Sequence, residues 1–184
     1  LMAGAKRPVF YTGGGVINAG PRAAAALREL VRLTGFPITS TLMGLGAFPA
    51  SGREWLGMLG MHGTYEANLA MNRCDVMVNI GARFDDRVTG RLDKFSPGSK
   101  KIHVDIDPSS INKNVRVDVP ILGDCAEVLE QMIEAWKALA AAPDKAPLIA
   151  WWAQVDAWRA RRSLNYKRSE DSIKPQYAVE RLYQ

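Results

Sequence analysis

The sequence predicts an α/β fold built on a parallel β-sheet, and three observations lead to that prediction. Residues 76–80, Val-Met-Val-Asn-Ile, form a short and almost unbroken apolar run, which suits a strand covered on both faces. Residues 8–41 read in order as a strand, a glycine turn, a helix and a second strand, which is a βαβ crossover. The run at 76–80 then ends in Gly81-Ala82 and leads into a charged loop, as expected where ligands bind at the carboxyl ends of strands.

Length and composition narrow the class of protein. The 184 residues allow one domain with a sizeable core and an additional segment. No apolar run approaches the roughly 20 residues of a membrane span, and we expect no secretory signal. Cys74 and Cys125 lie far apart without Cys-x-x-Cys spacing, so neither a zinc site nor a disulfide framework is indicated. A reduced, cytoplasmic setting and no membrane contact fit these features best.

The net charge of +5 is partly local. Basic residues gather near the C-terminus, at Arg159, Arg161, Arg162, Lys167 and Arg168. Such a cluster can contact nucleic acid. Because no nucleic-acid motif accompanies it, a solvated helix face or a contact surface between domains is the better interpretation, and no nucleic-acid partner is expected.

The first predicted unit contains a glycine triplet, Gly13-Gly14-Gly15, directly after the strand at 8–12. Three glycines let a backbone approach a ligand closely, with amides free to meet an anion at a helix start. The dinucleotide fingerprint is not met, since it needs glycine where Asn18 stands and an acid after the strand at 37–41. There is no Walker lysine either. A glycine turn without a ligand therefore stays open as an alternative.

The helix of this unit opens at Gly20-Pro21 and ends at Gly35 and Pro37, which are typical start and stop signals. The segment 42–63 that follows the second strand is long and rich in glycine and methionine, with a short strand possible near 55–58. Loops of this length in a compact domain are usually functional. Thr64 then caps a helix that leads into the strand at 76–80.

The loop after that strand carries four charges, Arg83, Asp85, Asp86 and Arg87. Two Asp–Arg pairs on a plain surface loop would explain them without a ligand. A site at the carboxyl end of a central strand explains them with one.

The strand predicted at 100–107 carries His103, Asp105 and Asp107 on one face, because their spacing is two residues. These side chains could suggest a metal site, but Pro108 follows directly and no second group of ligands is near in sequence. A carboxylate at the strand end that accepts hydrogen bonds from ribose hydroxyls is the more natural chemistry.

The last strand is predicted at 117–122, followed by a helix whose start, Asp124 and Glu127, has the spacing of a capping box. Residues 140–147 have the composition of a linker. A second helix is predicted at 148–168, with tryptophans on one side that need a partner surface: Trp151, Trp152 and Trp158. We expect these rings to fold back on the domain or to be buried against another copy. Residues 174–183 look like the opening of a further helix.

Several of these segments together closely resemble the large subunits of acetolactate synthase (acetohydroxyacid synthase). The segments are Gly13-Gly14-Gly15, Met58-Leu-Gly-Met-His-Gly63, Gly81-Ala-Arg-Phe-Asp-Asp-Arg-Val-Thr-Gly90, His103-Val-Asp-Ile-Asp-Pro108 and Ile111-Asn-Lys113. The third of them is the most specific. The resemblance covers nearly the whole chain but only the middle of that family's catalytic subunit.

The resemblance implies a doubly wound, mostly parallel six-stranded sheet, Rossmann-like, with a C-terminal helical linker. It divides the chain into a central FAD-binding domain at 1–142, an interdomain linker with a helix at 143–172, and the start of a thiamine diphosphate-binding domain at 173–184. Thiamine diphosphate and magnesium would be bound by domains absent here, so no catalytic residue is expected in this chain. The parent enzyme would decarboxylate pyruvate and condense it with a second 2-oxo acid, in branched-chain amino acid biosynthesis.

The same resemblance assigns residues to FAD. Those expected along its diphosphate, ribitol and flavin are Gly13, Gly14, Gly15, Thr41, Leu42, Met43, Leu59, Gly60, Met61 and His62. Those expected at the central crossing and the adenosine end are Gly81, Ala82, Arg83, Asp85, Arg87, Val88, Asp105, Ile106, Ser110, Gly123, Asp124 and Cys125. Many family members have glutamate where Asp105 stands.

The substrate channel of the whole enzyme would be bordered by Met61, Asp86 and Arg87, with Arg87 gripping a 2-oxo acid carboxylate. The FAD would be a structural requirement and not an electron carrier. Expected partners are the other domains of the subunit, further copies in a dimer or tetramer, and a regulatory small subunit. Two alternatives remain: the middle domain of another thiamine enzyme, such as a pyruvate oxidase with a redox-active flavin, or a stand-alone nucleotide-binding module.

Overall fold

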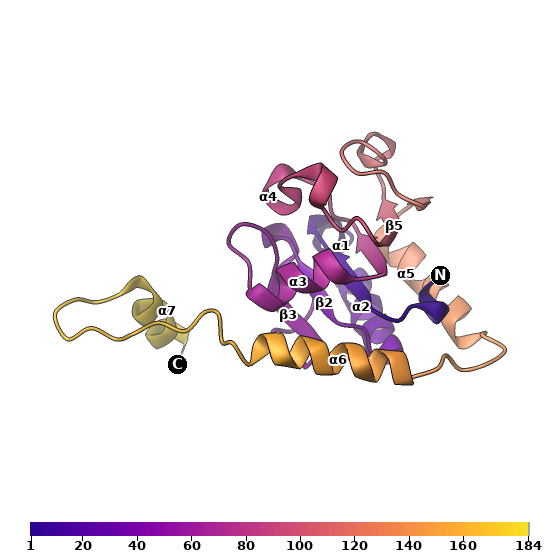
Figure 1. Cartoon of the computed structure of the whole chain (residues 1–184). Coiled ribbons are helices and arrows are strands. Elements are labelled where there is room, and N and C mark those ends of the chain that lie inside the picture. The colour runs from indigo at the N-terminus through magenta and orange to yellow at the C-terminus, as the bar shows by residue number, and fades with distance from the viewer. Residues whose placement is uncertain (184) are drawn as a thin grey trace.

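A computed structural model describes residues 1–183. Among these residues, six parallel strands form one sheet in the order β3-β2-β1-β4-β5-β6 (Figure 1). The strands are β1 (Pro8–Thr12), β2 (Ile38–Ser40), β3 (Trp55–Met58), β4 (Val76–Ile80), β5 (Lys100–Asp105) and β6 (Val119–Leu122). This order confirms the predicted doubly wound parallel sheet. It also places β1 beside β4 at the point where the strand order reverses.

Helices cover both faces of the sheet. Helices α1 (Gly14–Asn18), α2 (Pro21–Thr34) and α5 (Cys125–Lys137) pack with one apolar cluster, while α3 (Tyr65–Arg73) and α6 (Ala146–Arg159) pack with the other. The remaining helical segments are α4 (Asp86–Thr89), α7 (Pro175–Tyr183) and the 3₁₀ turns Met2–Gly4, Leu42–Gly44, Leu92–Lys94 and Pro108–Ser110. Both faces of the central strands are therefore buried, which explains their nearly continuous apolar sequences.

The helix signals read from the sequence operate as capping interactions. Helix α2 begins at Pro21 and ends at Gly35, whose φ of 69° is the left-handed conformation that glycine adopts readily. Thr64 accepts a hydrogen bond from the Ala67 amide at the start of α3. Asp124 accepts from the amides of Ala126 and Glu127 at the start of α5, so its predicted capping role is confirmed.

Helix α6 lies along the lower side of the molecule in Figure 1 and returns its tryptophans to the domain. Trp151 and Trp152 are buried, and their indole N–H groups donate to the carbonyls of Pro8 at 3.0 Å and Gly35 at 2.8 Å. Trp158 is buried against Trp151, with an edge-to-face ring distance of 5.4 Å. The expectation that these rings fold back on the domain is thus confirmed.

The predicted extent of this helix was wrong, because α6 ends at Arg159 rather than at residue 168. Its apolar stripe stops at Trp158, and the residues beyond have nothing to bury against the sheet. The Arg159 guanidinium donates to the carbonyls of Arg53 and Trp55, which fixes the helix end at β3. Arg162 then turns the chain with a φ of 49°.

Three further differences from the sequence prediction occur at the strand ends. The glycine triplet was predicted to form only a turn, but it begins a short helix, α1. The charged segment after β4 contains one helical turn, α4, instead of remaining a loop. Strand β5 ends at Asp105 and not at Asp107, because Asp107 turns outward to cap the 3₁₀ turn at Pro108–Ser110.

The C-terminal segment projects away from the body of the molecule (Figure 1). Helix α7 has no buried residue, and Val179 and Leu182 are exposed on it. Within residues 1–183, no helix is both long enough and apolar enough to cross a membrane.

Candidate functional site

The predicted site residues gather at one edge of the sheet. Because all six strands are parallel, the loops that follow them emerge on the same side. The predicted residues lie in the segments, loops and first helical turns, that follow the strands. They follow β1 (Gly13, Gly14, Gly15), β2 (Thr41, Leu42, Met43), β3 (Leu59, Gly60, Met61, His62), β4 (Gly81, Ala82, Arg83, Asp85, Asp86, Arg87, Val88), β5 (Asp105 at the strand's last position, then Ile106 and Ser110) and β6 (Gly123, Asp124, Cys125).

The loops after β1 and β4 cross in contact at the centre of this edge. The Gly13 amide donates to the Ile80 carbonyl at 3.1 Å, and the Gly15 amide donates to the Gly81 carbonyl at 2.9 Å. A Cβ on Gly13 would lie 2.5 Å from the Gly81 carbonyl oxygen, and one on Gly15 would lie 2.7 Å from the Gly81 Cα. Two of the three glycines are therefore required by the backbone of the neighbouring loop.

Gly14 differs from its neighbours. A Cβ there would meet only Met43, 3.3 Å from its Cβ and 3.7 Å from its carbonyl oxygen. Gly14 is the first residue of α1 and, like Gly15, is only partly buried, so the backbone of the loop after β4 does not require a glycine at this position.

The loop after β3 rests on α4. The Met61 amide donates to the Arg87 carbonyl at 3.2 Å, and a Cβ on Gly60 would lie 2.6 Å from the same carbonyl oxygen. The Asn68 side chain holds Gly60 from the other side, accepting from its amide at 2.8 Å and donating to its carbonyl at 3.0 Å. These contacts bring together the three residues predicted to border a substrate channel, Met61, Asp86 and Arg87.

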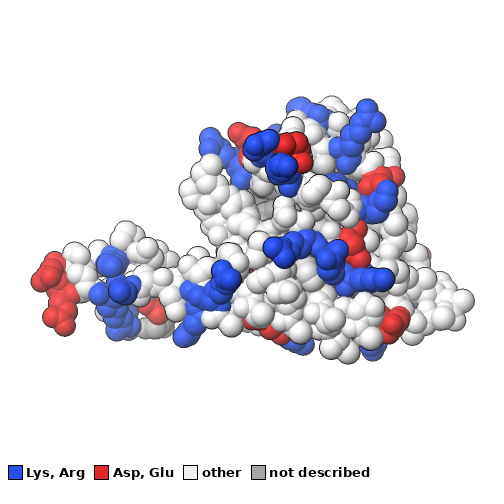
Figure 2. Space-filling model, in the orientation of Figure 1, with Lys and Arg blue, Asp and Glu red and all other residues white. Residues whose placement is uncertain are grey.

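The charges on this edge are mixed and exposed. Figure 2 shows acidic and basic side chains in contact at the top of the view, where Figure 1 draws α4. Arg83 lies 3.6 Å from Asp85, and Asp85 accepts from the Arg87 amide. Hydrogen bonding with Asp86 and from that amide lowers the pKa of Asp85 below its usual value. Among residues 1–183, the Arg87 guanidinium has no ion-pair partner and remains available to an anion.

Large apolar side chains are exposed on the same edge, although most apolar residues of the domain are buried. They are Leu42 (67% exposed), Met43 (73%), Met61 (67%), Ile106 (68%) and Leu122 (62%). Apolar walls with a few convergent polar groups are typical of a cofactor site.

The end of β5 supplies the carboxylate. Asp105 is nearly buried, and its Oδ1 accepts from the Asp107 amide at 2.9 Å. Ser110 and Asp107 form the neighbouring turn. Cys125 is buried near Gly81, and burial, with the charges of Asp124 and Asp105, raises the pKa of its thiol to about 12, which disfavours the thiolate near neutral pH.

Asn79 supports the site but was not identified from the sequence. Its side chain is fully buried and brackets Ala82, donating to the Ala82 carbonyl at 2.6 Å and accepting from its amide at 3.1 Å. The available signal was its position as the one polar residue inside the apolar run of β4.

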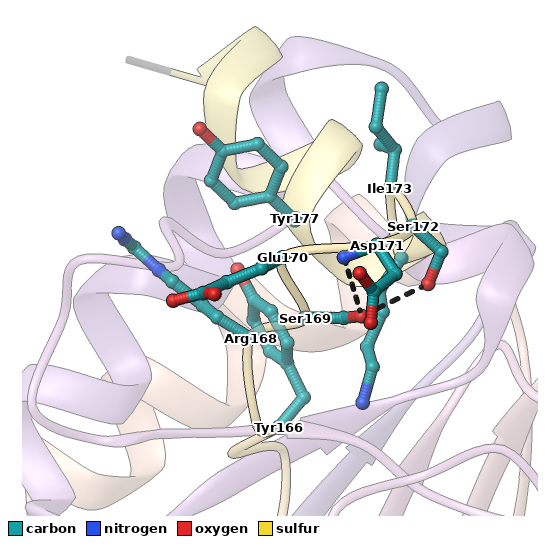
Figure 3. Close-up of a pocket in the computed structure, with 9 residues that line it drawn as sticks. Tyr166, Arg168, Ser169, Glu170, Asp171, Ser172, Ile173 and Tyr177 are labelled. Atoms are coloured by element: carbon teal, nitrogen blue, oxygen red, sulfur yellow. Dashed lines mark hydrogen bonds between the residues drawn. The ribbon is translucent and has the colours of Figure 1, made fainter.

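One hollow in the surface lies beside this edge of the sheet, and another lies away from it. One, of about 270 Å³, is lined by Leu59, Asn68, Met71, Asn72, Val88, Thr89, Arg91, Lys94 and Phe95, and so includes two predicted site residues. The other, of about 340 Å³, lies in the C-terminal segment between Tyr166 and Tyr177 and contains none of them (Figure 3). The described part of the chain has no group of three or more His, Cys, Asp or Glu residues placed to hold a metal ion.

These features define a doubly wound, Rossmann-like α/β domain, and comparison with known proteins specifies its family. Residues 1–132 match the family described as thiamine pyrophosphate enzyme, central domain. The chain belongs to this family.

Acetolactate synthases are among the relatives that it matches. It is 48% identical over 182 residues to the acetolactate synthase isozyme 3 large subunit of Escherichia coli (strain K12), covering 99% of this chain and 31% of that protein. It is 47% identical over 185 residues to the acetolactate synthase of Mycobacterium avium, covering 100% of this chain and 29% of that protein. The chain thus spans about three tenths of the length of these relatives. The resemblance drawn from the motifs is confirmed.

Proposed function

We propose that this chain is the central FAD-binding domain of an acetolactate synthase large subunit. The observation that carries the proposal is the 48% identity to such a subunit over 99% of the chain. The geometry agrees with it, because the residues that the family resemblance assigns to FAD follow all six strands and share one edge of the sheet.

The residues at this edge fit the parts of FAD. The Gly14 backbone, which the loop after β4 does not crowd, would approach the diphosphate. Asp105, a nearly buried carboxylate at a strand end, would accept from ribose hydroxyls, with Ser110, Gly123, Asp124 and Cys125 around the adenosine. The exposed apolar side chains Leu42, Met43 and Met61 would cover the flavin. When bound, FAD would support the structure of the enzyme and would not carry electrons in the reaction.

The whole enzyme would decarboxylate pyruvate and join it to a second 2-oxo acid, in the cytoplasm. Thiamine diphosphate and magnesium would be held outside this chain. In this proposal residues 1–142 are the FAD domain, 143–172 connect it to the next domain, and 173–184 begin that domain. Arg87 would bind the carboxylate of the second 2-oxo acid, since its guanidinium is exposed and without an ion-pair partner among residues 1–183.

The proposal is tested by titrating this chain with FAD, FMN and NAD, following flavin fluorescence and calorimetric heat. FAD should bind most tightly, because FMN lacks the adenosine that Asp105 would hold. Asp105→Asn should weaken FAD binding by about tenfold or more, which corresponds to one charge-assisted hydrogen bond. Asp171→Asn is the matched control, since Asp171 lies in the C-terminal hollow, and it should leave FAD binding unchanged. Saturable binding of NAD with no binding of FAD would overturn the assignment.

A further inference from the structure

His103 is buried without a hydrogen-bond partner. Its side chain is 0% exposed, and neither ring nitrogen makes a hydrogen bond within the described residues. Leaving such a group unpaired in the interior costs free energy, so its retention needs an explanation. The Asp105 carboxylate lies nearby, with its Oδ2 at 3.5 Å from His103 Nε2.

The surroundings of His103 hold it in place from several elements. It pairs in register with Asn79 on β4, and the Phe84 ring packs edge-on against it at 5.2 Å. Tyr11 on β1 pairs with Asn79 and donates its hydroxyl to the Arg83 carbonyl at 3.0 Å. The imidazole therefore lies beneath the loop 81–84, between that loop and the end of β5.

The imidazole is neutral near pH 7. Burial lowers the pKa of His103, and the Asp105 carboxylate and the Ala82 backbone oppose this effect. A neutral imidazole has one N–H to donate, and the carboxylate is the better acceptor for it.

The Asp105 carboxylate is fixed at only one of its two oxygens. Oδ1 accepts from the Asp107 amide at 2.9 Å, whereas among residues 1–183 the contact recorded for Oδ2 is the His103 ring at 3.5 Å. Its side chain is 12% exposed, so it still meets the ligand edge. A carboxylate held at one oxygen can rotate, and a rotating acceptor recognises a pair of hydroxyls poorly.

We propose that His103 is a positioning residue for ligand recognition: its Nε2–H donates to Asp105 Oδ2 and orients that carboxylate toward the ribose hydroxyls of a bound adenosine. The inference rests on the proposed FAD site. A small rotation of the Asp105 side chain would shorten the present 3.5 Å separation to a hydrogen bond. Each carboxylate oxygen would still have a second lone pair to accept from the ligand. Asn79, which lies opposite His103 on β4, also holds Ala82 in the loop after β4.

The test measures hydroxyl discrimination by calorimetry, with ADP, 2′-deoxy-ADP and 3′-deoxy-ADP as ligands for this chain. The wild-type chain should bind ADP at least about tenfold more tightly than one of the deoxy ligands. His103→Leu should reduce that ratio to about threefold or less. His103→Gln should keep most of it, because its amide nitrogen can occupy the place of Nε2. A ratio taken on one protein does not move when folding stability alone changes.

Two control variants separate the possible failures. Met77→Ala removes a fully buried side chain of β4 on the same face of the sheet, so it should lower stability and leave the ratio intact. Asp105→Asn should make the affinities for ADP and for the deoxy ligands about equal. If Asp105→Asn removes this discrimination and His103→Leu preserves it, the role of His103 is wrong while the FAD site stands. If wild-type protein binds neither FAD nor ADP, the proposed function itself fails and the inference fails with it.

Discussion

Replacing Trp151 should reveal how far the folded unit extends. Its side chain is 3% exposed, it packs edge-on against Trp158, and its indole donates to the Pro8 carbonyl at the start of β1. Truncation of a buried tryptophan typically costs about 3–5 kcal/mol. Because domains are stable by only about 5–15 kcal/mol, Trp151→Ala should remove a large part of the free energy of unfolding. Trp151→Phe keeps most of the packing but leaves a buried carbonyl unpaired, so it should cost about 1–3 kcal/mol.

The assay is urea unfolding of the 184-residue chain, followed by circular dichroism. Ile149→Ala is the matched control, because Ile149 lies in the same helix but is 67% exposed, and its effect should stay within about 0.5 kcal/mol. If Trp151→Ala behaves like Ile149→Ala, α6 is only a connecting segment. In that case our reading of its packing as part of the domain is refuted.

Three further predictions follow from the site and the core. Gly15→Ala should destabilise the chain by about 1–3 kcal/mol in urea unfolding, because it places a Cβ 2.7 Å from the Gly81 backbone. Gly14→Ala should change stability by less than about 1 kcal/mol, since its Cβ would not meet that backbone. Equal effects of the two variants would contradict our distinction between Gly14 and Gly15. In a full-length large subunit with this sequence, Arg87→Ala should slow condensation about tenfold to a hundredfold while sparing pyruvate decarboxylation, and Arg87→Lys should recover only part; normal condensation at saturating FAD would make Arg87 a scaffold residue. Burial raises the pKa of Cys74 from 9.0 to about 11, so the folded state retains a proton that the unfolded state loses, and stability should fall as pH rises through this range; Cys74→Ala should fall less steeply, and parallel pH profiles would refute that origin.

The sequence predicted what depends on local pattern. The apolar run at β4, the proline and glycine that bound α2, and the Asp124 cap each act within a few residues, so their signals were readable. The tryptophans of α6 were correctly expected to need a covering surface. What covers them, the start of β1 and the end of α2, depends on contacts more than 100 residues away, at Pro8 and Gly35.

The failures have a similar origin. The end of helix α6 was predicted nine residues too late because the sequence up to residue 168 does not oppose a helix, and its actual end is set by the Arg159 guanidinium at β3. The role of Asn79 was missed because its partner, the Ala82 backbone, is defined only once the loop after β4 turns. The burial of His103 under the Phe84 ring was not predicted, because spacing along one strand says nothing of a ring that packs over it from another loop.

The glycine triplet shows why a single motif is weak evidence at such a site. Gly13 and Gly15 are required because the loop after β4 crosses directly over them, with Gly81 at a φ of 60° on the other side. That crossing follows from the place of β1 beside β4 in this sheet, so this domain needs glycine at 13 and 15 whether or not it binds a dinucleotide. Only Gly14 is free of this backbone demand. A ligand site is therefore better recognised by residues that the fold itself does not need. Here these are the exposed apolar side chains at the strand ends and the Asp105 carboxylate, which lies beside a buried His103 whose ring makes no hydrogen bond among residues 1–183.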